Sequence, residues 1–140
     1  MLELAACATL LVSFLCGAVQ FGYTFYVYNQ LVTAVGNGGK YAAMRTYRGK
    51  DAEKGAAAIR NLVVYGDTHP EGGAVPVVPN LTPENVEVKW KLGESGAPEF
   101  VDISIINHHI DAVFGSLTLS GRPSVEFPFL GRYAPGEFEP

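Results

Sequence analysis

The chain begins with a long run of apolar and aromatic residues, in which Glu3 is the only charged side chain before residue 40. Residues 2–35 can form one uninterrupted helix, which would be about 51 Å long at about 1.5 Å per residue. Helix-forming residues continue to residue 45. Each glycine in a helix interior costs about 1 kcal/mol relative to alanine, so Gly36, Gly38 and Gly39 are a predicted hinge.

The remaining residues predict a small mixed head. Asp51 is a good N-cap for a second helix through Val63, and Gly66 can end that helix. Residues 66–85 are rich in proline and glycine and fit a surface loop. From Val86 the apolar residues recur at every second position, which is typical of strands with one buried face. We expect strands over 86–92, 100–106, 112–119 and 125–129, with 107–111 as a turn.

These elements predict an α+β fold, in which a long N-terminal apolar helix packs on a small antiparallel β-sheet. The expected division is a helix over residues 1–50 and a head over 51–140 with one short helix and about four strands. Pro128 cannot donate to a ladder, so the last strand is expected at a sheet edge.

The apolar run has three interpretations. A secretory signal peptide needs a basic segment before a short apolar core, and Lys40 is the first basic residue. An ordinary single-pass anchor needs only about 20 apolar residues to cross a hydrocarbon core about 30 Å thick. The third interpretation is a helix that crosses the membrane until it packs against copies of itself in a filament, and this one uses the whole length.

A basic cluster follows the apolar run at Lys40, Arg45, Arg48 and Lys50. It could mark a cytoplasmic flank, which would argue against export, because basic residues are enriched on that side of a membrane span. It could also contact lipid headgroups or form an ordinary solvated face. The net charge of −4 and the pI of about 5.3 provide no basic surface for nucleic acid.

The sequence shows no convincing catalytic or metal site. His108, His109 and Asp111 are adjacent, but in a strand only His109 and Asp111 share a face, and a zinc ion needs three or four ligands. Cys7 and Cys16 are about 13 Å apart on one helix and cannot form a disulfide with each other. We therefore expect no enzyme, cofactor or metal. Asn80 begins an N-glycosylation pattern, Asn-Leu-Thr, and is a weak candidate for modification.

Glu3 carries the most chemical information in the apolar run. A carboxylate inside hydrocarbon costs several kcal/mol unless it is protonated or paired. Its partner would be an α-amino group, either its own or that of an adjacent copy in a helical bundle. The alternative is that Glu3 lies in the interface at the edge of the membrane.

Four segments in order resemble the TadE-like pilins of tight-adherence systems, a branch of the type IV pilin superfamily. In order, these segments are Glu3-Leu4-Ala5, Gln20-Phe21-Gly22-Tyr23-Thr24-Phe25-Tyr26, Asn29-Gln30-Leu31-Val32-Thr33-Ala34 and Gly39-Lys40-Tyr41-Ala42-Ala43-Met44-Arg45. The resemblance implies a prepilin peptidase that cuts a basic leader after a glycine, an assembly platform, and a carboxylate at Glu3 that registers subunits. Such proteins usually carry this glutamate about five residues into the mature chain, whereas here Met1 stands first and Glu3 is third.

The predicted assembly residues are Glu3, Phe14, Phe21, Tyr23, Phe25, Tyr26 and Tyr28. The aromatic rings can be interpreted as a belt at the membrane surface or as contacts between helices in a filament core.

We expect a structural pilus subunit that resides in the inner membrane, then polymerises through its N-terminal helix into an extracellular adhesive filament. The alternatives are a minor pseudopilin that initiates or caps another filament, and a single-pass, membrane-tethered binding domain.

Overall fold

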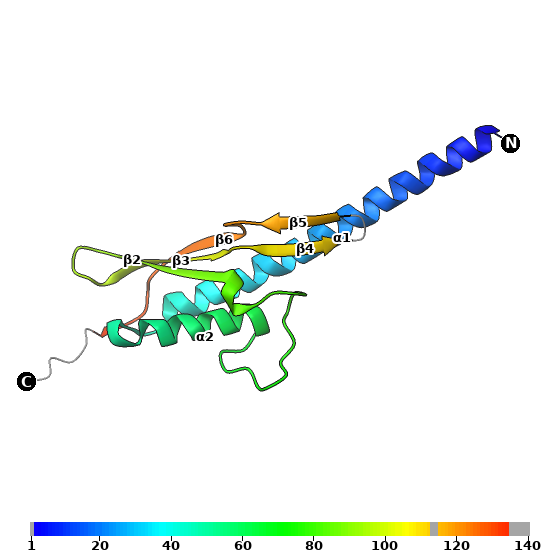
Figure 1. Ribbon diagram of the computed structural model, residues 1–140. Helices are drawn as coiled ribbons and strands as arrows, with labels where there is room; N and C mark the ends of the chain where they lie inside the picture. Colours follow the sequence, from blue (N-terminus) through cyan, green and yellow to red (C-terminus); the bar gives the residue numbers. More distant parts are fainter. Residues whose placement is uncertain (1, 113–114, 135–140) are drawn as a thin grey trace, which may run out of the picture.

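A single long helix, α1 (Leu2–Met44), runs through the whole molecule, and its N-terminal half projects away from the head (Figure 1). The computed structural model describes residues 2–112 and 115–134. The other elements are β1 (Tyr47–Arg48), η1 (Gly49–Asp51), α2 (Ala52–Tyr65), η2 (Pro83–Asn85), β2 (Val86–Leu92), β3 (Pro98–Ile105), β4 (His108–Ala112), β5 (Gly115–Leu119), β6 (Ser124–Pro128) and β7 (Tyr133–Ala134).

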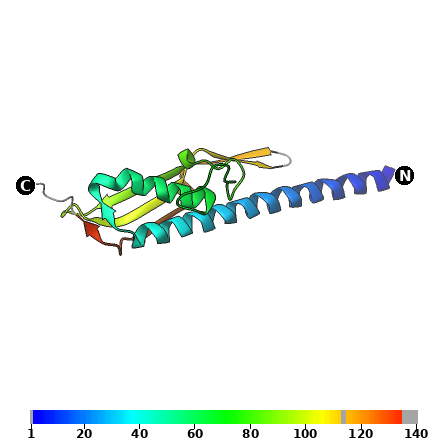
Figure 2. The same ribbon diagram turned by 90° about the horizontal axis from the view of Figure 1, so that it is seen from below.

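The head has two layers, with α2 and the C-terminal half of α1 side by side on one face of a β-sheet (Figures 1 and 2). This sheet is antiparallel, with the strand order β2-β3-β6. In the central strand β3, Val101, Ile103 and Ile105 are fully buried and alternate with less buried residues. The predicted α+β architecture, with a long apolar helix against an antiparallel sheet, is confirmed.

Several local predictions are confirmed at residue level. Helix α2 follows Asp51 and ends at Gly66, which adopts a left-handed conformation with φ 74° and donates its N–H to the Leu62 carbonyl. The alternating segment forms β2 over Val86–Leu92. Strand β6, which ends at Pro128, lies at an edge of its sheet.

The prediction of one continuous four-stranded sheet is wrong. Residues 108–111, expected as part of a turn, belong to β4, which pairs with β5 in a separate two-stranded sheet. Asn107, at φ 50°, makes the sharp change of direction between β3 and β4. The expected strand over 112–119 includes residues 113 and 114, which lie outside the described residues.

A short parallel pair, β1 with β7, ties the C-terminal segment to the end of α1. The Leu130 N–H donates to the Ala43 carbonyl, and the Tyr47 N–H donates to the Arg132 carbonyl, both at 2.8 Å. The first of these bonds satisfies one of the last carbonyls of α1, which have no partner within the helix.

Candidate assembly surface

Helix α1 is divided by burial near Val27. From Leu2 to Tyr26 no residue is buried, whereas Val27 is 3% exposed and Leu31 and Val35 are 0% exposed. The exposed half is apolar, and α1 is long and apolar enough to cross a membrane by length and composition. A helix that is apolar on all sides must be covered on all sides. Within one chain, the head covers only the C-terminal half.

The buried face of α1 follows a helical repeat. Val27, Leu31, Ala34, Gly38 and Ala42 are three or four residues apart and all lie in the core. Toward the N-terminus the same face continues with partly buried Thr24, Gln20 and Cys16. Gln20 Nε2 donates to the carbonyl of Gly115 at 3.4 Å, so β5 reaches the helix beyond the end of the buried core.

The glycine run does not interrupt the helix, because α1 is continuous from residue 2 to residue 44. A Cβ at Gly38 would overlap Val63 Cγ2 of α2, and one at Gly39 would lie 2.5 Å from Phe127 Cδ2 of β6. A Cβ at Gly36, in contrast, would have no heavy atom within 4 Å. The glycines therefore do not end the helix, and Gly38 and Gly39 let α2 and β6 approach the axis of α1. A hinge at Gly36, Gly38 and Gly39 stays a prediction.

The predicted assembly residues separate into two groups. Phe14, Phe21 and Phe25 are 78%, 80% and 66% exposed, and Tyr26 is 59% exposed although its hydroxyl accepts a hydrogen bond from Gln30 Nε2. Tyr23 is 38% exposed, whereas Tyr28 is partly buried against the head core. Tyr28 thus already has a partner within its own chain.

Glu3 lies on the same side of α1 as the three exposed phenylalanines. Phe14, Phe21 and Phe25 are 11, 18 and 22 residues after Glu3, so at 3.6 residues per turn all four fall within an arc of about 40°. We call these four residues the Glu3–Phe ridge. The same calculation places the ridge about 120° away from the face that packs on the head. Among the described residues, the ion pairs join residues of the head, and none involves Glu3.

The predicted histidine cluster is split between the two sides of β4. His108 is 2% exposed, and neither of its ring nitrogens has a hydrogen-bond partner among the described residues. Burial lowers the pKa of His108 below its usual value, with a smaller contribution from neighbouring His109. His109 and Asp111 share the exposed side, where Thr118 Oγ1 lies 2.9 Å from His109 Nδ1 and Asn80 Nδ2 donates to Asp111 at 3.4 Å. Asn80 itself is exposed and has φ 61°, and its modification stays a prediction.

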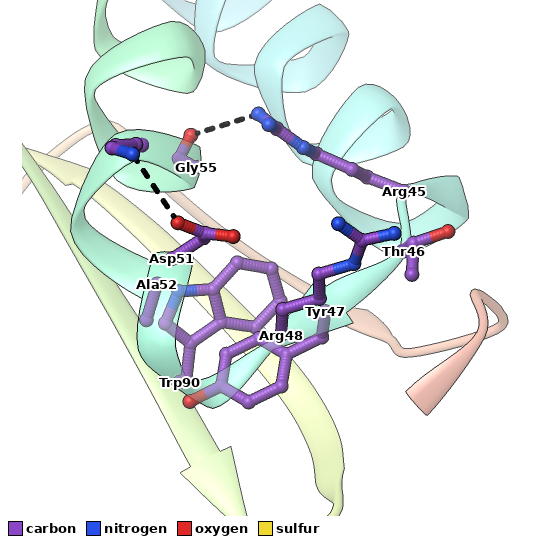
Figure 3. A pocket seen from close by; sticks show the side chains of 9 residues that line it. Arg45, Thr46, Tyr47, Arg48, Asp51, Ala52, Gly55 and Trp90 are labelled. Carbon is purple, nitrogen blue, oxygen red and sulfur yellow. Dashed lines mark hydrogen bonds and ion pairs between the residues drawn. The ribbon is translucent and has the colours of Figure 1, made fainter. Parts of the chain in front are cut away.

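A pocket of about 410 Å³ lies at the C-terminal end of α1, where sequence reasoning had found only a basic cluster (Figure 3). Arg45 and Arg48 of that cluster line it, together with Lys54 and the aromatic side chains of Tyr47 and Trp90. The sequence did not indicate this site because Trp90 is at least 40 residues from every member of the cluster and reaches it only through the fold.

Comparisons with known proteins support the resemblance found in the sequence. The family model described as TadE-like protein matches residues 1–39. No curated protein and no solved structure gives a significant match. The matched segment contains the whole exposed half of α1 and the first part of its buried face. The predicted resemblance is confirmed for this segment: residues 1–39 are similar to TadE-like proteins.

Proposed function

We propose that this chain is a structural subunit of a tight-adherence pilus, held in the membrane by the first half of α1 before assembly and polymerised through the same surface. The observation that carries the proposal is the apolar segment from Leu2 to Tyr26, in which the rest of the described chain buries no residue. The TadE-like match lies on this segment and associates it with the tight-adherence system. Extracellular export of the filament belongs to the same proposal.

The distribution of aromatic side chains favours assembly over a simple anchor. Residues 2–26 extend about 37 Å, more than the hydrocarbon core requires. Phe14 and Phe21 differ by seven residues, so they lie almost above one another and present large ring surfaces to a neighbouring helix. Between them, Gly17 has no side chain, and a Cβ there would have no heavy atom within 4 Å. A large residue of a second helix fits against such a gap.

Because Glu3 lies on this ridge, its carboxylate is on the same side of α1 as Phe14 and Phe21. A neighbouring copy that packs against Phe14 and Phe21 would also lie beside Glu3, so its α-amino group could pair with the carboxylate as the helices bundle. If the two chains are shifted along their axes, this pair between carboxylate and α-amino group forms only between subunits. The chain needs no catalysis, cofactor or nucleic acid in this role, and its partners are copies of itself, a prepilin peptidase and an assembly platform.

The test compares filament formation with membrane insertion in cells that carry the assembly system. Glu3→Gln and Phe21→Ser should leave the chain in the membrane fraction. Each should reduce the number of filaments sheared from the cells, counted by electron microscopy, at least about tenfold. Val75→Ser is the matched control, because Val75 is 82% exposed on a loop of the head. It should assemble normally.

Normal filament yield from both ridge variants would refute assembly through this surface. Filaments that contain the chain only in trace amounts would instead identify a minor pseudopilin. Failure of the wild-type chain to enter any filament, with a ligand bound by the head, would identify the membrane-tethered binding domain.

A further inference from the structure

The pocket at the C-terminal end of α1 combines positive charge with aromatic walls. Arg45, Arg48 and Lys54 carry three positive charges and Asp51 one negative charge, in a chain whose net charge is −4. In Figure 3 the Arg45 guanidinium group reaches toward Gly55, on the side of the pocket where Asp51 lies, and the Arg48 guanidinium group lies apart from it, near Thr46. The pocket volume falls within the range of about 300–1,000 Å³ that is typical of small-molecule sites.

The positive charge of the pocket is only partly compensated. Asp51 pairs with Lys54 at 3.4 Å. Arg45 Nη1 donates to the Gly55 carbonyl at 3.3 Å, which uses one of its five N–H donors, and its Cζ lies 5.8 Å from the centroid of the Tyr41 ring. Arg45 forms no ion pair among the described residues. Arg48 is exposed and forms no ion pair with any residue that the structure describes. Two guanidinium groups, which are well shaped for a carboxylate, therefore line the pocket without an ion-pair partner among the described residues.

The aromatic wall is held rigidly by the fold. The ring centroids of Tyr47 and Trp90 are 5.0 Å apart, and Phe129 packs edge-on against Trp90 at 6.0 Å. Tyr133 stacks on Tyr47 from β7, the strand that pairs with β1. Such a platform can pack against the apolar C–H face of a sugar ring at low conformational cost, because its side chains are already ordered.

The position of the pocket excludes the lipid-headgroup interpretation of the basic cluster. Arg45 follows Tyr26 by 19 residues of continuous helix, or about 28 Å along α1. The headgroup layers add only about 5–8 Å on each side of the hydrocarbon core. If residues up to Tyr26 lie in the membrane, the pocket is beyond the reach of that membrane and faces soluble or surface-bound ligands.

We propose that this pocket binds an acidic saccharide unit, with the carboxylate on Arg45 and Arg48 and the sugar ring against Tyr47 and Trp90. The inference goes beyond pilus assembly, because binding takes place in a single subunit. It also gives the basic cluster a role that membrane contact does not.

Trp90 is the single tryptophan of the chain, so its fluorescence reports on this pocket alone. The full chain in detergent is titrated with digalacturonic acid, maltose and inorganic phosphate. We expect a saturable change in Trp90 fluorescence with digalacturonic acid only, weakened by added salt. Arg48→Gln should raise its Kd at least about tenfold, as expected for loss of a charge-assisted hydrogen bond. Lys40→Gln is the control, because Lys40 belongs to the same basic cluster but does not line the pocket.

Each of three results would overturn the proposal. Equal affinity of the Arg48→Gln and wild-type chains for digalacturonic acid would show that the Arg48 guanidinium group does not contact the ligand. An equal response to maltose would show that the acid group is not recognised. An equal response to phosphate would show a general anion site without saccharide recognition. Because the assay uses subunits in detergent, its outcome is separate from filament formation.

Discussion

Replacing Gly36 or Gly38 by alanine, one at a time, should have opposite effects on the stability of the head. Gly36→Ala and Gly38→Ala both lie inside α1, so both should gain about 1 kcal/mol of helix propensity. Their surroundings differ: a Cβ at Gly36 enters open space, while one at Gly38 overlaps Val63 Cγ2. Val63 is fully buried in α2, and a β-branched side chain in a helix strongly prefers one rotamer, so it cannot turn away freely.

The expected magnitudes follow from these contacts. Overpacking a core by one methyl group costs about 1–3 kcal/mol. Gly36→Ala should thus stabilise the head by about 1 kcal/mol, and Gly38→Ala should destabilise it by up to about 2 kcal/mol. The difference of about 1–3 kcal/mol isolates the contact with Val63, because the propensity gain is common to both variants.

The assay is denaturant unfolding of the full chain in detergent, followed by Trp90 fluorescence. The double variant Gly38→Ala/Val63→Ala provides an internal check, since removing Val63 Cγ2 should lessen the cost of the new methyl group and give a favourable coupling energy. Equal stabilisation by Gly36→Ala and Gly38→Ala would refute close packing at Gly38. It would return the glycine run to its interpretation as a flexible point in the helix.

Three other perturbations have defined outcomes. His108→Leu should abolish an acid-dependent loss of stability, because burial lowers the pKa of His108 in the folded state. In the wild type, the stability present above the unfolded-state pKa of about 6.5 should fall at lower pH by up to about 1.4 kcal/mol per pH unit. Equal urea midpoints of the wild type at pH 7.5 and 5.5 would contradict this. Asn85→Ala should cost about 2–4 kcal/mol in chemical unfolding, because this side chain accepts from Thr82 and donates to the Ile106 and Asn107 carbonyls. Asn85→Asp should cost at least as much, because its carboxylate cannot donate and would face both carbonyl oxygens, and an unchanged urea midpoint for this variant would contradict the reasoning. Gly66→Ala should lower the thermal midpoint by an amount equivalent to about 1 kcal/mol, because Gly66 ends α2 at φ 74°, and an unchanged midpoint would show that this turn tolerates a side chain.

Local elements were predictable where the signal is contained in a few neighbouring residues. Asp51 and Gly66 mark the limits of α2, and the alternation from Val86 to Leu92 gives β2 at its observed bounds. The exposed apolar half of α1 was predictable for the same reason, because an uninterrupted apolar run needs an apolar environment whatever the rest of the chain does. The position of Glu3 on that run also followed directly from the sequence.

The pairing of distant segments was not predictable from local patterns. Most of β4 was expected as a turn, and its residues form a strand because the turn at Asn107 brings them into register with β5. Strand β1 has two residues and no periodicity of its own, and it exists because β7 returns to it from the end of the chain. The aromatic pocket depends on that return, so only its charged residues were visible as a cluster in the sequence. Gly38 shows the reverse problem: a residue that locally disfavours a helix is retained where α2 needs the space.

The hairpin of β4 and β5 sets how deeply the chain can enter a bilayer. Its strands form a separate two-stranded sheet, and open sheet edges cannot lie in hydrocarbon without losing backbone hydrogen bonds. Because Gln20 contacts Gly115, immersion in hydrocarbon stops at about residue 19. Residues 2–19 extend about 27 Å, close to the thickness of the hydrocarbon core. In the membrane state proposed for the chain, Phe21 to Tyr26 then lie at the water interface, where a neighbouring subunit can meet their rings first, while Phe14 remains in the hydrocarbon.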